Sequence, residues 1–85
     1  MYLFKTFNKK IQKKLERYIS NNPVIKNKFL KLKINPRKEV GAHPLYGKLK
    51  GKWSCWLSSN IRMIYTIADK NKIIIIEAVG THKVY

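Results

Sequence analysis

Apolar residues in the first part of the chain recur every three to four positions, with lysines between them, which is the spacing of an amphipathic helix. Two stretches follow this pattern, residues 7–20 and residues 22–35. Their apolar residues are Phe7, Ile11, Leu15, Tyr18, Ile19, Val24, Ile25, Phe29 and Leu32. The pattern predicts a helical hairpin with one apolar face, and residues 2–5 before it are suited to a short strand.

The residues at the ends of these stretches support two separate helices. Asn8 or Thr6 is placed to cap the start of the first helix. Asn22 is placed to cap the second, because Pro23 then takes the first helical position, where its missing N–H costs nothing. We expect the second helix to end just before Pro36, since a proline disfavours helical backbone in the residue that precedes it.

The second half of the chain changes to the two-residue alternation of strands. Residues 45–52 and 61–67 alternate, and residues 53–59 between them continue as a strand that ends in a turn at residues 58–60. Residues 73–79 hold a run of isoleucines that indicates a central strand buried on both faces. We therefore predict an α+β fold in the order β-α-α-β-β-β. In it a helical hairpin packs on one face of a small, twisted, antiparallel sheet of three or four strands. The chain is short enough for a single domain, residues 1–85.

The alternation assigns side chains to the two faces of this sheet. The apolar set that suits the face beneath the helices is Ile61, Met63, Tyr65 and Ile67. Arg62 then points to the opposite face. By the same alternation Tyr46, Lys48 and Lys50 share that face with it. An open sheet face with cations and an aromatic ring is a suitable cradle for RNA, where bases stack and phosphates pair with positive charge.

Charge narrows the class of partner. The chain has 19 Lys and Arg against four Asp and Glu, a formal net charge of +15, spread over its whole length. Such self-repulsion works against a compact state, so we expect a polyanion as partner. An acidic protein partner and a charged surface that serves only solubility are the other interpretations. A polyanion partner and an acidic protein partner are compatible if the protein masks the polyanion site.

The cysteine, the histidines and the glycines indicate where the protein is located and whether it binds a cofactor. Cys55 is the lone cysteine, so no internal disulfide forms, and we expect a cytoplasmic protein without a signal peptide or membrane span. The two histidines are far apart in sequence, and Cys55 has no ligand partner at metal-binding spacing. Gly47 and Gly51 do not lie between a strand and a helix, as a nucleotide-binding loop requires. We expect neither a metal nor a small-molecule cofactor.

Residues 43–85 resemble the C-terminal half of RelE-type toxins of type II toxin–antitoxin systems, within the RelE/ParE superfamily. The resemblance rests on Leu45-x-Gly47, Gly51-x-Trp53-Ser54, Arg62-Met-Ile-Tyr65 and Gly80-Thr-His82-x-x-Tyr85. The two basic helices before them match the family's order. The resemblance implies a sheet backed by a helical hairpin. For the RelE-like branch it also implies cleavage of mRNA in the ribosomal A site and neutralisation by an acidic antitoxin.

Cleavage of RNA needs no metal, because the 2′-OH beside the scissile phosphate is the nucleophile. Such a site needs a base for the 2′-OH, positive charge on the phosphorane-like transition state and an acid for the leaving 5′-oxygen. Arg62 is the first candidate for the phosphate, since its guanidinium offers two parallel donors. His82 is the candidate acid or base, because an unperturbed histidine titrates near neutral pH.

The resemblance adds further site residues. Tyr85 matches a C-terminal tyrosine that stacks on a base or orients the 2′-OH. His43 stands where relatives place a second acid–base group. The expected RNA-binding residues are Lys48, Lys50, Lys52 and Tyr46. Trp56 is suited to be a stacking platform or part of a partner surface, while Trp53, on the other face of a regular strand, is suited to the core.

Two other readings stay open. A ParE-like toxin shares the fold and inhibits DNA gyrase by binding, although it does not need the combination of Arg62, His82 and Tyr85. An inactive relative would serve as an RNA-binding or antitoxin-binding module.

Overall fold

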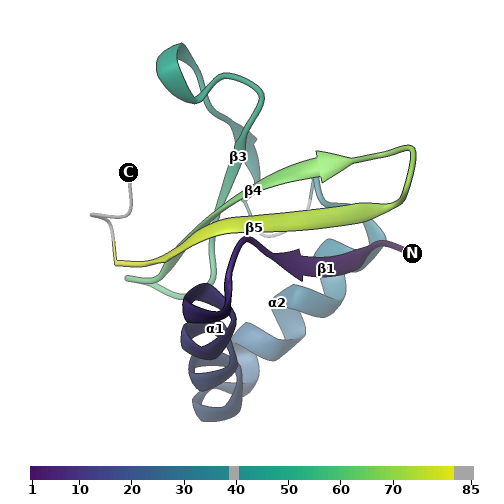
Figure 1. The fold of residues 1–85 in the computed structure, drawn as a ribbon. Coiled ribbons are helices and arrows are strands. Elements are labelled where there is room, and N and C mark those ends of the chain that lie inside the picture. The colour runs from purple at the N-terminus through teal and green to yellow at the C-terminus, as the bar shows by residue number, and fades with distance from the viewer. Residues whose placement is uncertain (39–40, 82–85) are drawn as a thin grey trace.

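A computed structural model describes residues 1–38 and 41–81 of the chain. Its elements are β1 (Leu3–Thr6), α1 (Lys9–Asn21), α2 (Pro23–Ile34), β2 (His43–Pro44), the 3-10 helix η1 (Gly47–Leu49), β3 (Trp53–Trp56), β4 (Arg62–Ala68) and β5 (Ile73–Gly80). They form a five-stranded sheet in the order β1-β5-β4-β3-β2, with both helices on one side (Figure 1). The predicted α+β fold and helical hairpin are confirmed. The sheet is mixed rather than wholly antiparallel, because β1 pairs with β5 in parallel.

The helix ends follow the predicted capping chemistry. The N–H of Ile11 donates to the side chain of Asn8 at 2.9 Å, and that of Val24 donates to the side chain of Asn22 at 3.0 Å. α2 stops at Ile34, where the N–H of Asn35 donates to the carbonyl of Lys31 at 3.1 Å. Each cap satisfies backbone groups that the helix itself leaves without partners.

The core lies between the two helices and one face of the sheet. The helices contribute Leu15, Ile25, Phe29 and Leu32. The sheet contributes Cys55, Met63, Tyr65, Ile74, Ile76 and Val79, and Leu57 joins them from the turn just after β3. The assignment of Met63 and Tyr65 to this covered face is therefore confirmed. Ile61 and Ile67 pack against the same cluster, partly buried. Two residues assigned to the apolar helix face lie outside it: Phe7 is 69% exposed, ahead of α1, and Val24 is 55% exposed.

Residues 45–52 form a loop, so their predicted strand is wrong. On this side of β3, the paired residues are His43 and Pro44, and the chain then enters η1. Gly47 and Gly51 take φ values of 69° and 93°, which an extended strand does not contain and which glycine adopts at no steric cost. Leucine and glycine took turns at the odd positions 45–51, which matched strand alternation, while the glycines allowed a turn. Figure 1 shows this loop extending beyond the sheet, well away from both helices.

The isoleucine run forms β5, an interior strand rather than the middle one. It lies between β1 and β4, and β4 is central. Ile74 and Ile76 are fully buried against the helices, whereas Ile73 and Ile75 on the other face are half-buried. The prediction of burial on both faces therefore holds only for the helix side.

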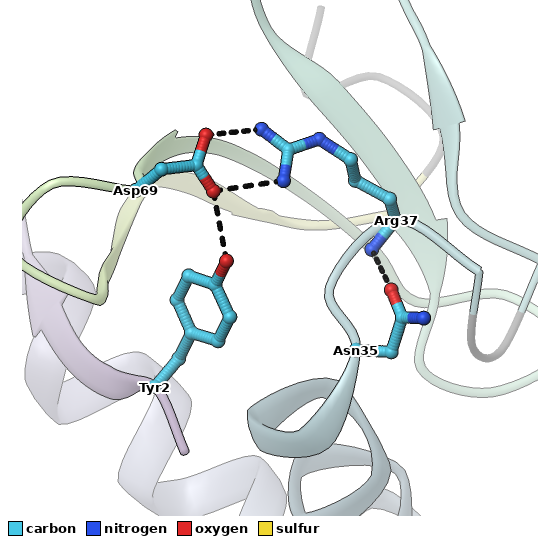
Figure 2. A network of polar contacts seen from close by, with 4 residues as sticks. All are labelled: Tyr2, Asn35, Arg37 and Asp69. Atoms are coloured by element: carbon cyan, nitrogen blue, oxygen red, sulfur yellow. Dashed lines mark hydrogen bonds and ion pairs between the residues drawn. The ribbon is translucent and has the colours of Figure 1, made fainter.

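A polar cluster ties together three segments that are distant in sequence (Figure 2). Arg37, in the turn after α2, donates two hydrogen bonds to the carboxylate of Asp69, at 2.9 and 2.6 Å. The hydroxyl of Tyr2 donates to the same carboxylate at 2.8 Å. These hydrogen bonds, first from Arg37 and then from Tyr2, lower the pKa of Asp69 to about 2. The N-terminus, the turn after α2 and the β4–β5 turn are held against one another.

The chain just beyond α2 has a second anchor from the core. The buried hydroxyl of Tyr65 donates to the carbonyl of Pro36 at 2.6 Å. Burial raises the pKa of Tyr65, so it stays a neutral donor. Together with the cluster around Asp69, this bond fixes where the chain leaves the helical layer. Among the described residues, no helix is both long and apolar enough to cross a membrane.

Candidate functional site

The sheet face opposite the helices carries Arg62 at the start of β4. The next residue, Met63, is fully buried in the helix-side core, so strand alternation directs Arg62 to the other face, as predicted. Its direct partner on β3 is Trp56, and the guanidinium carbon lies 4.2 Å from the centroid of the indole ring. Its partner on β5 is Gly80, which contributes no side chain. Arg62 is thus held against an aromatic ring on its β3 side, and Gly80 on its β5 side is itself buried.

The residues at the centre of this face are buried and not exposed to solvent. Ser54 and Ile64 are direct cross-strand partners, and both are buried, although neither belongs to the helix-side core. Ala78 continues the row on β5. The floor of the candidate site is therefore small and mostly apolar, with charged groups at its margins.

An ion pair crosses the face at the opposite end of the row. The ammonium of Lys52, just before β3, donates to the carboxylate of Glu77 on β5. Ile64 pairs with Ala78 and Tyr65 with Ile76, so Glu77 is the extra residue of a β-bulge. The side chains are 31% and 19% exposed, respectively. Lys52, predicted to bind phosphate, is engaged by one of the four acidic residues of the chain.

His43 lies on the same face but at a distance from Arg62. It is exposed on β2, where its partner is Ser54, while Arg62 lies two strands over and two residues along. Strand spacing alone puts their Cα atoms about 12 Å apart. A ring nitrogen of His43 lies 3.4 Å from the carbonyl of Pro44. A nucleotide lying across β3 would be needed to connect His43 with Arg62.

The other candidates divide into two groups. Tyr46, Lys48 and Lys50 are exposed on the loop between β2 and β3 rather than on the sheet face, and Tyr46 is 80% exposed. This loop joins the Trp53 end of β3, whereas Arg62 pairs at the Trp56 end. His82 and Tyr85 lie outside the described residues.

Two features of this face were not predicted from the sequence: the contact between Trp56 and Arg62, and the ion pair between Lys52 and Glu77. The contact between Trp56 and Arg62 follows from a hairpin centred on residue 59, which pairs these two positions, so the turn at residues 58–60 was a usable signal. Glu77 is conspicuous in the sequence as an acidic residue within an apolar strand. Its pairing with Lys52 could not be predicted, because a bulge shifts the strand register by one residue.

Metal and thiol chemistry find little support in this region. Within residues 1–38 and 41–81, no group of three or more His, Cys, Asp or Glu residues is arranged to hold a metal ion. Cys55 is buried, and burial raises its pKa to about 12. It is therefore a neutral thiol at physiological pH, without the nucleophilicity of a thiolate.

Comparison with known proteins places this geometry in a structural context. No protein-family model and no curated protein matches the chain. The YoeB/ParE toxin from Agrobacterium tumefaciens superposes with a TM-score of 0.70 at 17% identity, over 96% of this chain and 99% of that one. The YoeB–YefM complex from Staphylococcus aureus gives 0.71 at 20% identity, over 96% and 98%.

The RelBE2 toxin–antitoxin complex from Mycobacterium tuberculosis gives a TM-score of 0.62 at 18% identity, over 95% of this chain and 98% of that one. The chain has the fold of RelE/ParE toxins. This RelE-type fold spans nearly the full length of both partners in each comparison. Identities of 17–20% carry the fold and leave the activity to be argued from the site.

Proposed function

We propose that the chain is the toxin of a type II toxin–antitoxin system and cleaves mRNA, in the ribosomal A site, without a metal. The observation that carries the proposal is Arg62, held against Trp56 on the sheet face opposite the helices, in a RelE-type fold whose chain has a net charge of +15. A basic sheet face with an arginine and an aromatic ring suits single-stranded RNA.

The chemistry assigns a role to each candidate. Arg62 binds the scissile phosphate and stabilises charge that develops on it as the 2′-OH attacks. His82 and His43 are the acid–base candidates, and Tyr85 stacks on a base or orients the 2′-OH. Cleavage through the 2′-OH gives a 2′,3′-cyclic or 3′-phosphate and a 5′-OH end. Lys48, Lys50 and Tyr46 bind nucleotides further along the RNA, and Lys52 binds a phosphate in competition with Glu77.

The proposal includes a protein partner. An acidic antitoxin is expected because the surface is strongly basic, and because the RelBE2 structure is that of a toxin–antitoxin complex. We further propose that residues 1–85 act as one domain in the cytoplasm.

Expression without an antitoxin tests the proposal. We expect growth to stop and mRNA to be cut within reading frames. The purified chain, treated with EDTA and then desalted, should cleave mRNA on programmed ribosomes as well as the untreated chain does. Arg62→Ala should remove both effects, while Arg17→Ala, at an exposed arginine on α1, should retain them. Intact mRNA together with full growth arrest would contradict the RNase proposal.

The ParE-like alternative is kept because one similar structure carries both names, YoeB and ParE. It predicts growth arrest with intact mRNA and reduced supercoiling by gyrase. Absence of toxicity would point instead to an inactive binding module.

A further inference from the structure

Trp56 and Arg62 make a contact that no strand pairing requires. They are direct cross-strand partners, and the guanidinium lies over the ring face rather than extending into solvent. Both side chains are half-buried. An arginine that contacts an aromatic ring through its face keeps its N–H donors in the guanidinium plane, directed away from the ring. The contact therefore restricts the direction in which Arg62 presents these donors.

The backbone beneath this contact is itself fixed. The ammonium of Lys28, on α2, donates to the carbonyl of Trp56 at 3.3 Å, from the helix side of the sheet. The neighbouring Cys55 and Leu57 are fully buried in the core. The ring of Trp56 thus stands on a rigid strand, which is what a platform for a flexible arginine requires.

The other tryptophan serves a different purpose and supplies a comparison. Trp53, three residues earlier, packs against the helix-side core, whereas Trp56 is absent from that cluster. Trp53 also lies near a cation, Arg37, but at the longer distance of 5.8 Å. Apolar packing accounts for Trp53 and leaves Trp56 without a core role.

We propose that Trp56 is a positioning residue for RNA binding: it holds the Arg62 guanidinium so that its donor edge faces a phosphate crossing the open sheet face. This inference rests on the proposed function, and it adds a residue that acts on RNA through Arg62. The partner of Arg62 on β5 is Gly80, which adds no side chain of its own beside the guanidinium.

A double-mutant cycle on RNA binding tests this role. The probe is a single-stranded 2′-O-methyl RNA, which lacks the nucleophile and stays intact, and its Kd is measured by fluorescence anisotropy. We expect Trp56→Leu to weaken binding about tenfold when Arg62 is present and less than twofold in the Arg62→Ala background. Trp56→Phe, which keeps a ring face, should bind within about threefold of the unchanged protein.

The cycle separates positioning from mere structural damage. A fold defect weakens binding equally in both backgrounds, and equal losses would overturn the proposal. So would Trp56→Leu binding as tightly as the unchanged protein. If the unchanged protein binds no RNA, the proposed function fails, whereas RNA binding without the coupling sinks this inference alone.

The two tryptophans also give an optical readout. In Trp53→Phe, Trp56 is the remaining tryptophan. We expect its fluorescence to change on adding the 2′-O-methyl RNA and this change to disappear when Arg62→Ala is added. In Trp56→Phe the signal of Trp53 should stay constant. A response from Trp53 equal to that of Trp56 would contradict the assignment of phosphate to the Arg62 side of the sheet.

Discussion

Glu77→Gln is expected to make RNA binding tighter at low salt and more sensitive to salt. The carboxylate of Glu77 holds the ammonium of Lys52, and both groups are partly screened from solvent. The amide of glutamine carries no charge, so Lys52 becomes available to a phosphate. The isosteric change leaves the bulge in β5 with a side chain of the same size.

The magnitude follows from counterion release. Each further phosphate contact steepens the log–log dependence of affinity on salt by about 0.7 for a single strand. Between about 50 and 200 mM salt, a fourfold change, the variant should lose about 2.6-fold more affinity than the unchanged protein. A shift of this size is small, so the slope has to be measured over several salt concentrations.

Anisotropy titrations with a labelled single-stranded RNA measure both slopes. Glu16→Gln is the matched control, because it removes the same charge from an exposed position on α1. We expect its slope to equal that of the unchanged protein. Equal effects of the two variants would reduce the result to net charge, and an unchanged slope for Glu77→Gln would refute the view that this carboxylate competes with RNA for Lys52.

Three further predictions concern the fold. Leu32→Ala should lower the free energy of unfolding by about 2–5 kcal/mol, since Leu32 is fully buried. Leu30→Ala, at an exposed position of α2, should change it far less. Urea unfolding followed by circular dichroism measures both variants. Tyr65→Phe should lower the free energy of unfolding by about 1–3 kcal/mol in the same assay, because it leaves the buried carbonyl of Pro36 without its donor. A loss below about 0.5 kcal/mol would mean that a water molecule replaces the hydroxyl. Asp69→Asn should lower Tm at neutral pH, because the carboxylate of Asp69 is lost. The pKa of Asp69 is about 2 in the folded protein and 3.8 ordinarily. The stabilisation by this carboxylate is therefore complete above about pH 4 and is lost as the pH falls towards 2. A difference in Tm that persists undiminished at pH 2 would contradict this linkage.

Local chemistry made much of the fold predictable. The caps at Asn8 and Asn22 use side chains that act within three residues, so they could be identified from sequence. The facial assignment of Met63 and Tyr65 needed only alternation along β4. These features depend on neighbours in the chain and not on how distant segments meet.

Most of the features that could not be predicted depend on how distant segments of the chain pair. The parallel pairing of β1 with β5 joins Leu3 to Ile73, and no pattern within either strand specifies that partner. The loop between β2 and β3 was misread because Gly47 and Gly51 match strand spacing but adopt left-handed backbone. The pairing of Lys52 with Glu77 depends on a one-residue bulge. Arg62 was placed on the correct face, but its aromatic partner emerged only from the cross-strand register.

The pairing of β1 with β5 also sets when the molecule becomes complete during synthesis. Leu3–Thr6 are made well before their strand partners, Ile73–Ile76, which come much later in the chain. Until then β1 has no sheet to join, and the carboxylate that binds Tyr2 and Arg37, Asp69, does not yet exist. The helical hairpin can form early, because its contacts are local. The sheet face that carries Arg62 can assemble only once β5 has left the ribosome, so a product that stops before β5 would lack it.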